Sequence, residues 1–198
     1  MANATQAFGL RPVRHISGAP YNGATIKCYI SASYATALFV GDGVIFSITA
    51  AHKDPTARYP SIIACVGNSG GLIRGVIVSF DPRPDGLDKL YNPASTEGYA
   101  NVCVDQDVVF QIRDTGVAVP TKLFPGQNAV IVLAAGSTTT GLSGAKMNTT
   151  PANTQAYPLH ILGVAEQEDN ELAASAVWEV LLNTNENTTG RFLGVVAS

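Results

Sequence analysis

The sequence has few charged residues, and this shortage limits what the protein can be. Charged side chains make up 14% of the 198 residues, against roughly 25% in ordinary soluble domains. Apolar side chains make up 46%. So few charges favour coverage of the surface by partner subunits, although enzymes of low charge also exist. The net charge of −3 disfavours nucleic acid as the main ligand, because phosphate binding requires a clustered positive field.

Cysteine is also scarce, and its pattern excludes a disulfide framework. Cys28, Cys65 and Cys103 are odd in number and too widely spaced for a CxxC metal pair. Their apolar neighbours predict three reduced thiols that are buried in the core. A secretory signal is missing, and no apolar run approaches the roughly 20 residues that span a bilayer. We therefore expect no membrane partner and a reducing, soluble setting.

Helix-type patterns are nearly absent, whereas short strand-type segments recur along the sequence. Runs rich in Val, Ile, Phe and Tyr alternate with turn residues at intervals of roughly 8 to 12 residues, which is typical of a closed barrel or a two-sheet sandwich. Only residues 170–175 favour a short helix, and residues 81–96 and 138–155 are expected to be long loops. We therefore predict an all-β fold, with strands over residues 27–30, 37–40, 44–49, 61–66, 72–80, 100–104, 108–113, 129–135, 157–165, 176–183 and 191–196.

Acidic residues are absent from the first forty positions, where the charged side chains are Arg11, Arg14 and Lys27. Glycine and proline interrupt this stretch too often for a helix, and it is too apolar for a solvated tail. We therefore predict an extended N-terminal arm over residues 1–26, followed by a single β domain over residues 27–198. Residues 2–23 are expected to lie against another subunit. The candidate contact residues are the apolar Phe8, Leu10 and Tyr21 and the cationic Arg11 and Arg14.

Acidic side chains gather instead near the C-terminus, where residues 166–186 contain six acids and no base. The basic N-terminal arm and this acidic region could pair between neighbouring subunits or within one chain. Two ordinary solvated faces are the alternative interpretation.

One pair of motifs resembles a serine protease. Residues 48–52 (Ile-Thr-Ala-Ala-His) and 67–71 (Gly-Asn-Ser-Gly-Gly) are similar to the segments that carry the histidine base and the serine nucleophile of trypsin-like enzymes. That fold takes the two residues from different barrels, whereas His52 and Ser69 lie too close in the sequence for half a barrel to separate them. A carboxylate to orient the imidazole ring is also missing, so we expect the protein not to be an enzyme.

Metal and cofactor patterns are weak as well. The three histidines lie far apart and lack the spacing of zinc ligands. Asp105 and Asp107 share one face of a strand and could hold Mg²⁺ or Ca²⁺, but further acidic ligands are missing nearby, which favours a solvated strand edge. The glycine-rich segments lack a phosphate-binding pattern. We therefore expect no metal and no cofactor.

Several short motifs occur in an order that resembles a known family. They are residues 7–14 (Ala-Phe-Gly-Leu-Arg-Pro-Val-Arg), 34–42 (Tyr-Ala-Thr-Ala-Leu-Phe-Val-Gly-Asp), 102–112 (Val-Cys-Val-Asp-Gln-Asp-Val-Val-Phe-Gln-Ile), 140–144 (Thr-Gly-Leu-Ser-Gly), 161–164 (Ile-Leu-Gly-Val) and 177–180 (Val-Trp-Glu-Val). Together they look like small head proteins of tailed bacteriophages, which act as cement or decoration proteins on the outside of the major capsid lattice.

The resemblance implies a fold, a function and partners. The fold would be a jelly-roll-like sandwich or barrel. The protein would be made in the bacterial host cytoplasm and would bind the outer surface of the virion, where it stabilises the lattice of the phage major capsid protein. It would also bind copies of itself, as a homodimer or homotrimer at local symmetry axes.

The alternative hypothesis is a module displayed on the virion that binds glycans of the host surface. Such a site would need exposed aromatic side chains in loops. Trp178, the single tryptophan, lies in a predicted strand, where packing in the core is favoured over stacking on a sugar.

Overall fold

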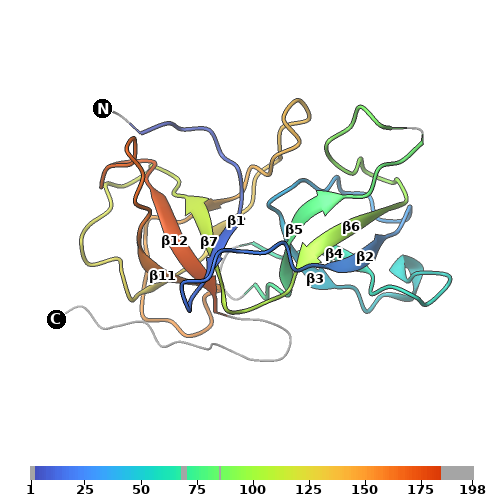
Figure 1. Ribbon diagram of the computed structural model, residues 1–198, viewed down its shortest axis with the longest axis horizontal. Coiled ribbons are helices and arrows are strands. Elements are labelled where there is room, and N and C mark those ends of the chain that lie inside the picture. The colour runs from blue at the N-terminus through green and yellow to red at the C-terminus, as the bar shows by residue number, and fades with distance from the viewer. Residues whose placement is uncertain (1–2, 68–70, 85, 184–198) are drawn as a thin grey trace.

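A computed structural model describes residues 3–67, 71–84 and 86–183 of the chain. Two five-stranded antiparallel sheets, sheet A and sheet B, lie beside each other and account for most of its regular structure (Figure 1). This arrangement confirms the predicted all-β class. Among the described residues, helix is limited to one 3₁₀ turn, η1 (Ala50–His52). The described residues form no helix that is long and apolar enough to cross a bilayer.

Sheet A combines strands from distant parts of the sequence. In the order of the sheet they are β1 (Arg11–His15), β7 (Val108–Arg113), β12 (Val177–Leu182), β11 (Leu159–Val164) and β8 (Asn128–Ala129). A short ribbon of β9 (Ile131–Val132) and β10 (Lys146–Met147) follows β8 in the chain. Met147 then bridges to Asp114, directly after β7, so the ribbon returns to the centre of the sheet.

Sheet B curls until its two edge strands meet. Its strands, in order, are β2 (Ile26–Ile30), β6 (Gly98–Cys103), β5 (Gly75–Phe80), β3 (Gly43–Phe46) and β4 (Ile62–Ala64). Tyr29 in β2 forms a bridge with Ser61, directly before β4, and its amide donates to the Pro60 carbonyl oxygen at 2.9 Å. The curled sheet encloses its own cluster of buried apolar side chains, including Ile30 and Val102.

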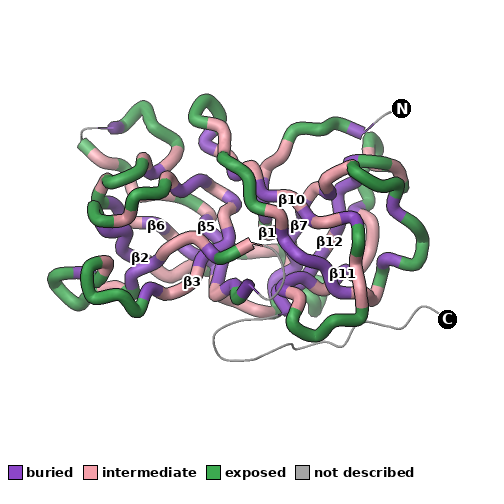
Figure 2. Tube along the Cα trace, turned by 180° about the vertical axis from the view of Figure 1, so that it is seen from behind, coloured by how far each residue is buried: buried purple, intermediate pink, exposed green. Residues whose placement is uncertain are grey.

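A larger apolar cluster joins the two sheets. It contains Phe110 and Trp178 from sheet A together with Val76 and Cys103 from sheet B, and all four side chains are fully buried. Figure 2 shows buried residues along the strands and exposed residues mainly in the connecting loops. Burial of one large apolar side chain contributes roughly 1.5–3 kcal/mol. The shared cluster therefore stabilises the contact between the sheets.

The buried carboxylate of Asp114 ties the end of β7 to the start of β12. Asp114 has no exposed surface, and its oxygens accept hydrogen bonds from the amides of Gly116, Ser175 and Ala176 at 2.7, 2.9 and 3.1 Å. The indole N–H of Trp178 donates to the same carboxylate at 3.0 Å. These four donors compensate for the loss of water around a buried charge.

The strand predictions agree best with the structure in the centres of the sheets. β7 has the predicted bounds, and the other long strands differ from the predicted ranges mainly at their ends. Residues 37–40 form only isolated bridges, at Leu38 and Val40. β1 and β10 lie in segments without a predicted strand. The strand predicted over residues 191–196 lies outside the described residues.

The helix predicted over residues 170–175 is wrong. The side-chain amide of Asn170 donates to the carbonyl oxygens of Ala165 and Val177 at 2.8 and 2.9 Å, and its oxygen accepts from the Val177 amide at 2.8 Å. Asparagine competes with helix formation through such bonds to the backbone. Ser175 also has a φ of 63°, which ends any right-handed helical path.

We predict that Asp114→Asn destabilises the fold. The amide group of asparagine presents N–H donors to the donors that surround this position, and each buried group left without a partner costs about 1–3 kcal/mol. Urea unfolding followed by the emission of Trp178 measures the change. Asp88→Asn on an exposed loop is the control, with an expected change within about 0.5 kcal/mol. Equal midpoints for both variants would contradict the role of Asp114.

The three cysteines are free and buried, as the sequence predicted. Burial raises the pKa of Cys28 and of Cys65 to about 12, and it also raises the pKa of Cys103. Because the thiolate is the reactive form, we expect the native protein to react slowly with a thiol-specific disulfide reagent at neutral pH and all three thiols to react quickly in denaturant. Rapid labelling of the native protein would contradict the burial of the three thiols.

Candidate interaction surface

The N-terminal segment, predicted as an arm, lies against its own chain. Residues 11–15 pair with β7 in antiparallel register, so this segment forms an edge strand of sheet A. Asn3 is buried, and its side chain exchanges hydrogen bonds of 2.9 and 3.0 Å with the backbone of Glu171. Leu10 is 1% exposed and belongs to the cluster that joins the sheets. The β domain therefore begins before residue 27, and Leu10 is a core residue, not an exposed contact residue.

One arginine of the basic N-terminal segment pairs with one acid of the acidic C-terminal region within the chain. An Arg14 guanidinium nitrogen lies 2.6 Å from a carboxylate oxygen of Glu179 in β12. Arg11 donates to the amide oxygen of Gln111 in β7, also at 2.6 Å. The first pair is partly exposed, and such pairs typically contribute about 0–1 kcal/mol. Arg14 is therefore occupied inside the chain, whereas Arg11 has a neutral partner.

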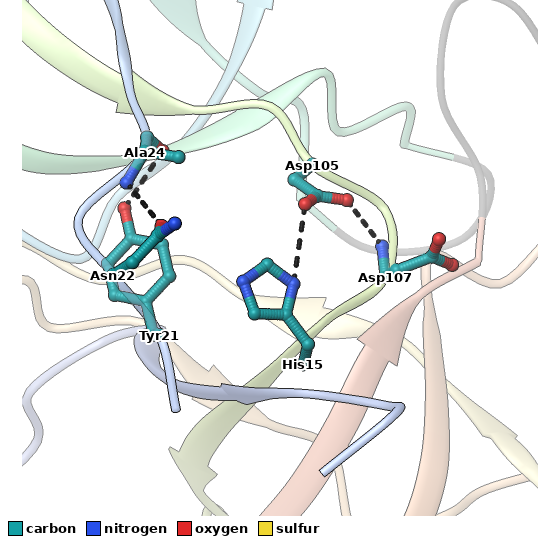
Figure 3. Close-up of polar contacts among 6 residues, drawn as sticks. All are labelled: His15, Tyr21, Asn22, Ala24, Asp105 and Asp107. Carbon is teal, nitrogen blue, oxygen red and sulfur yellow. Dashed lines mark hydrogen bonds and ion pairs between the residues drawn. The ribbon is translucent and has the colours of Figure 1, made fainter. Parts of the chain in front are cut away.

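A short turn follows β1 and holds Tyr21 near the connection between β6 and β7. The His15 ring lies between Tyr21 and Asp105 (Figure 3), and His15 Nδ1 is 3.5 Å from Asp105 Oδ2. The other oxygen of Asp105 accepts a hydrogen bond from the Asp107 amide at 2.9 Å. The Tyr21 hydroxyl donates to the Ala24 carbonyl oxygen at 3.0 Å. The turn is thus anchored at both ends.

Two glycines bring the N-terminal segment against the strand-like residues 38–42. The Leu10 amide donates to the Gly41 carbonyl oxygen at 2.9 Å. A Cβ atom on Gly9 would lie 2.5 Å from that oxygen, and a Cβ atom on Gly41 would lie 2.5 Å from the Phe8 carbonyl oxygen. Both glycines also have a positive φ, 70° and 92°. Only glycine satisfies both conditions, the left-handed backbone and the close approach.

A third segment completes the same region. The Val40 amide donates to the Gly141 carbonyl oxygen at 2.9 Å, and the Ser143 amide donates to the Val40 carbonyl oxygen at 2.8 Å. The motifs at residues 7–14, 34–42 and 140–144 are therefore in direct contact, although they are far apart in the sequence.

These three segments, together with β5 and the turn after β1, surround an apolar hollow of about 360 Å³. We call it the N-terminal hollow, and its lining residues are Phe8, Leu10, Arg11, Pro12, Tyr21, Val40, Ile77, Val78 and Leu142. The Arg11 guanidinium lies 5.0 Å from the centre of the Phe8 ring, which is within the range of a cation–π contact.

The structure thus gathers four of the five predicted contact residues around one hollow. Arg14 is the exception, because it pairs with Glu179 on sheet A. Val40, Ile77, Val78 and Leu142 are lining residues that sequence reasoning missed. Two of them, Val40 and Leu142, stand beside glycines in motifs already singled out, but nothing in the sequence indicates that these motifs meet.

The sequence candidates for catalysis and metal binding do not form a site within the described residues. No group of three or more His, Cys, Asp and Glu side chains there could hold a metal ion. Asp105 is occupied by His15 and by its own loop. His52 Nδ1 lies 3.3 Å from Ser47 Oγ, and its ring contacts the ring of Tyr34. Ser69 lies outside the described residues.

Protein-family models, curated proteins and solved structures gave no match to this chain.

We predict that Gly41→Ala destabilises the protein more than Gly23→Ala does. Both positions have a positive φ, 92° and 80°, so both substitutions cost about 1–2 kcal/mol of backbone strain. A Cβ atom at Gly23 meets nothing within 4 Å, whereas one at Gly41 overlaps the backbone of Phe8. Thermal unfolding of the two variants isolates the cost of that overlap. Equal melting temperatures would show that the two segments separate without penalty.

Proposed function

We propose that this protein is a capsid decoration protein that binds the outer surface of a tailed-phage head and stabilises the lattice of the major capsid protein. The observation that carries the proposal is the convergence of three motifs. The segments at residues 7–14, 34–42 and 140–144, which resemble this family, meet at the N-terminal hollow. An apolar hollow at the surface of a chain with few charges suits a protein that covers other proteins.

The mechanism would be mechanical. A genome-filled capsid is under outward pressure, and its subunits fail by separating at the seams between them. A protein that lies across two subunits adds binding free energy that is lost when they separate. Specific protein contacts commonly bury roughly 1,200–2,000 Å². Linking several weak contacts through one oligomer raises the overall affinity by roughly 10²–10⁴. The proposal therefore includes a homodimer or homotrimer at a local symmetry axis. It also includes the jelly-roll connectivity that the family resemblance implies.

The contact surface in this proposal is narrower than the sequence suggested. Phe8, Arg11 and Tyr21 line the N-terminal hollow and remain candidate contacts. Deleting residues 2–23 would remove β1 from sheet A and Leu10 from the core. Such a deletion would unfold the domain instead of removing an arm, so the function is best tested with the intact chain.

The glycan-binding alternative has less support. Trp178 is fully buried and stacks on Phe124 with ring centroids 5.4 Å apart. The partly exposed rings of Tyr59 and Tyr99 have Lys27 Nζ over them, at 5.4 and 4.5 Å from their centroids. A sugar would have to displace this lysine, which is also 2.5 Å from a carboxylate oxygen of Asp81.

We predict that phage heads assembled without this chain release their DNA at a lower temperature than complete heads. The purified chain, added back, should co-sediment with the deficient heads and restore their resistance to heat and osmotic shock. An unrelated soluble protein of similar size and charge is the control for non-specific adsorption. Deficient heads that tolerate heat as well as complete heads would contradict the proposal. Saturable binding to a glycan array without binding to heads would favour the alternative.

A further inference from the structure

A second hollow, of about 350 Å³, adjoins the N-terminal hollow. It lies between the end of β5, the loop that follows it and the segment at residues 140–142. Val40, Val78 and Leu142 line both hollows. The two hollows are therefore neighbours that share a wall, and we call the pair the groove.

The groove has an apolar base and partly fixed aromatic walls. Tyr21 lines the N-terminal hollow, and its hydroxyl is hydrogen-bonded to Ala24. Tyr91 lines the second hollow and stacks on Phe39 with ring centroids 5.0 Å apart. Rings that are already held in place lose little conformational freedom when a partner binds.

Two leucines beside the groove are unusually exposed. Leu87 and Leu90 line the second hollow and are 75% and 59% exposed. Exposed apolar side chains beside an apolar hollow often mark sites of protein interaction on soluble proteins.

The charge at the rim of the groove is positive. Arg11 is exposed, and its contacts are with the neutral Gln111 and Phe8 side chains. Lys89 is exposed, and its side-chain ammonium group has no hydrogen bond or ion pair with the part of the chain that the structure describes. Asp81, an acid in the lining, is already bound to Lys27 and Asn101 at 2.5 and 3.1 Å. A partner with carboxylates would therefore complement this rim.

We propose that the groove binds an extended segment of the capsid subunit, with apolar side chains that fill the two hollows and flanking carboxylates that pair with Arg11 and Lys89. The identity of the partner rests on the proposed function. Two adjacent hollows suit a peptide segment, whose side chains provide separate anchors, better than one compact ligand. The charge pairs at the rim are expected to speed association and to weaken with salt.

The test uses a pair of synthetic peptides with the same apolar stretch of Leu and Val, flanked by Glu in one peptide and by Lys in the other. Fluorescence anisotropy should show binding of the Glu-flanked peptide to the intact chain at an affinity at least about tenfold higher than that of the Lys-flanked peptide. The double variant Arg11→Glu with Lys89→Glu should reverse this preference. Arg58→Glu with Lys122→Glu, an equal change of charge at exposed positions outside the groove, should leave it unchanged.

A second pair of variants tests the apolar part of the groove. Leu87→Ser should weaken binding of the Glu-flanked peptide, whereas Val117→Ser, at a position 86% exposed and outside the groove, should not. Both side chains are largely exposed, so neither substitution disturbs the core. No preference for the Glu-flanked peptide, or an equal effect of the two serine variants, would overturn the proposal.

Binding to phage heads separates this inference from the proposed function. Intact chain that binds heads, with the double variant binding about tenfold more weakly, supports both. If the intact chain and the double variant bind heads equally well, the proposed role of the groove is overturned and the proposed function stands. If the intact chain does not bind heads but still prefers the Glu-flanked peptide, the proposed function is overturned and the binding chemistry of the groove stands. A dimer of the intact chain that the double variant abolishes in sedimentation velocity would identify a second copy as the occupant and overturn the proposal.

Discussion

The backbone contact between Gly9 and Gly41 is the constraint on which the candidate surface depends. Gly9 precedes the core residue Leu10 and β1 in sheet A, and the Gly41 amide donates to the Ile77 carbonyl oxygen in β5 of sheet B, at 2.8 Å. The contact therefore links the two sheets at their boundary. A side chain on either glycine would overlap backbone atoms of the other segment, so the approach depends on residues without a Cβ atom. It also places Phe8 at the wall of the N-terminal hollow.

Because the N-terminal segment is part of the fold, a partner that contacts this segment does not have to order it. A disordered arm must lose conformational entropy when it binds, which reduces its affinity for a given contact area. Here the segment is already ordered by β7, by the core and by the bond between Arg14 and Glu179. The side chains that remain at its surface, including Phe8 and Arg11, are held in place before any partner arrives. Such preorganisation lowers the cost of binding.

Sequence patterns predicted the elements whose structure is set locally. Residues 108–113 combine β-branched and aromatic side chains between turn residues, and β7 has these bounds. The pattern failed where a distant group decides the conformation. Residues 170–175 are held by two such groups: the Asn3 side chain bonds to the backbone of Glu171, and the Asp114 carboxylate accepts from the Ser175 amide. Residues 11–15 contain a proline and read as an arm, yet they become an edge strand because β7 offers a free edge.

The sequence by itself determined the all-β class and the three buried thiols, because composition, β propensity and turn residues act over a few neighbouring positions. It also named four of the nine residues that line the N-terminal hollow, Phe8, Leu10, Arg11 and Tyr21. Tertiary structure alone decided that Phe8, Val40 and Leu142 meet, and that Leu10 is buried while Arg11 is exposed at the same hollow. These outcomes depend on close packing between segments that are distant in the chain, and local sequence patterns carry no information about that distance.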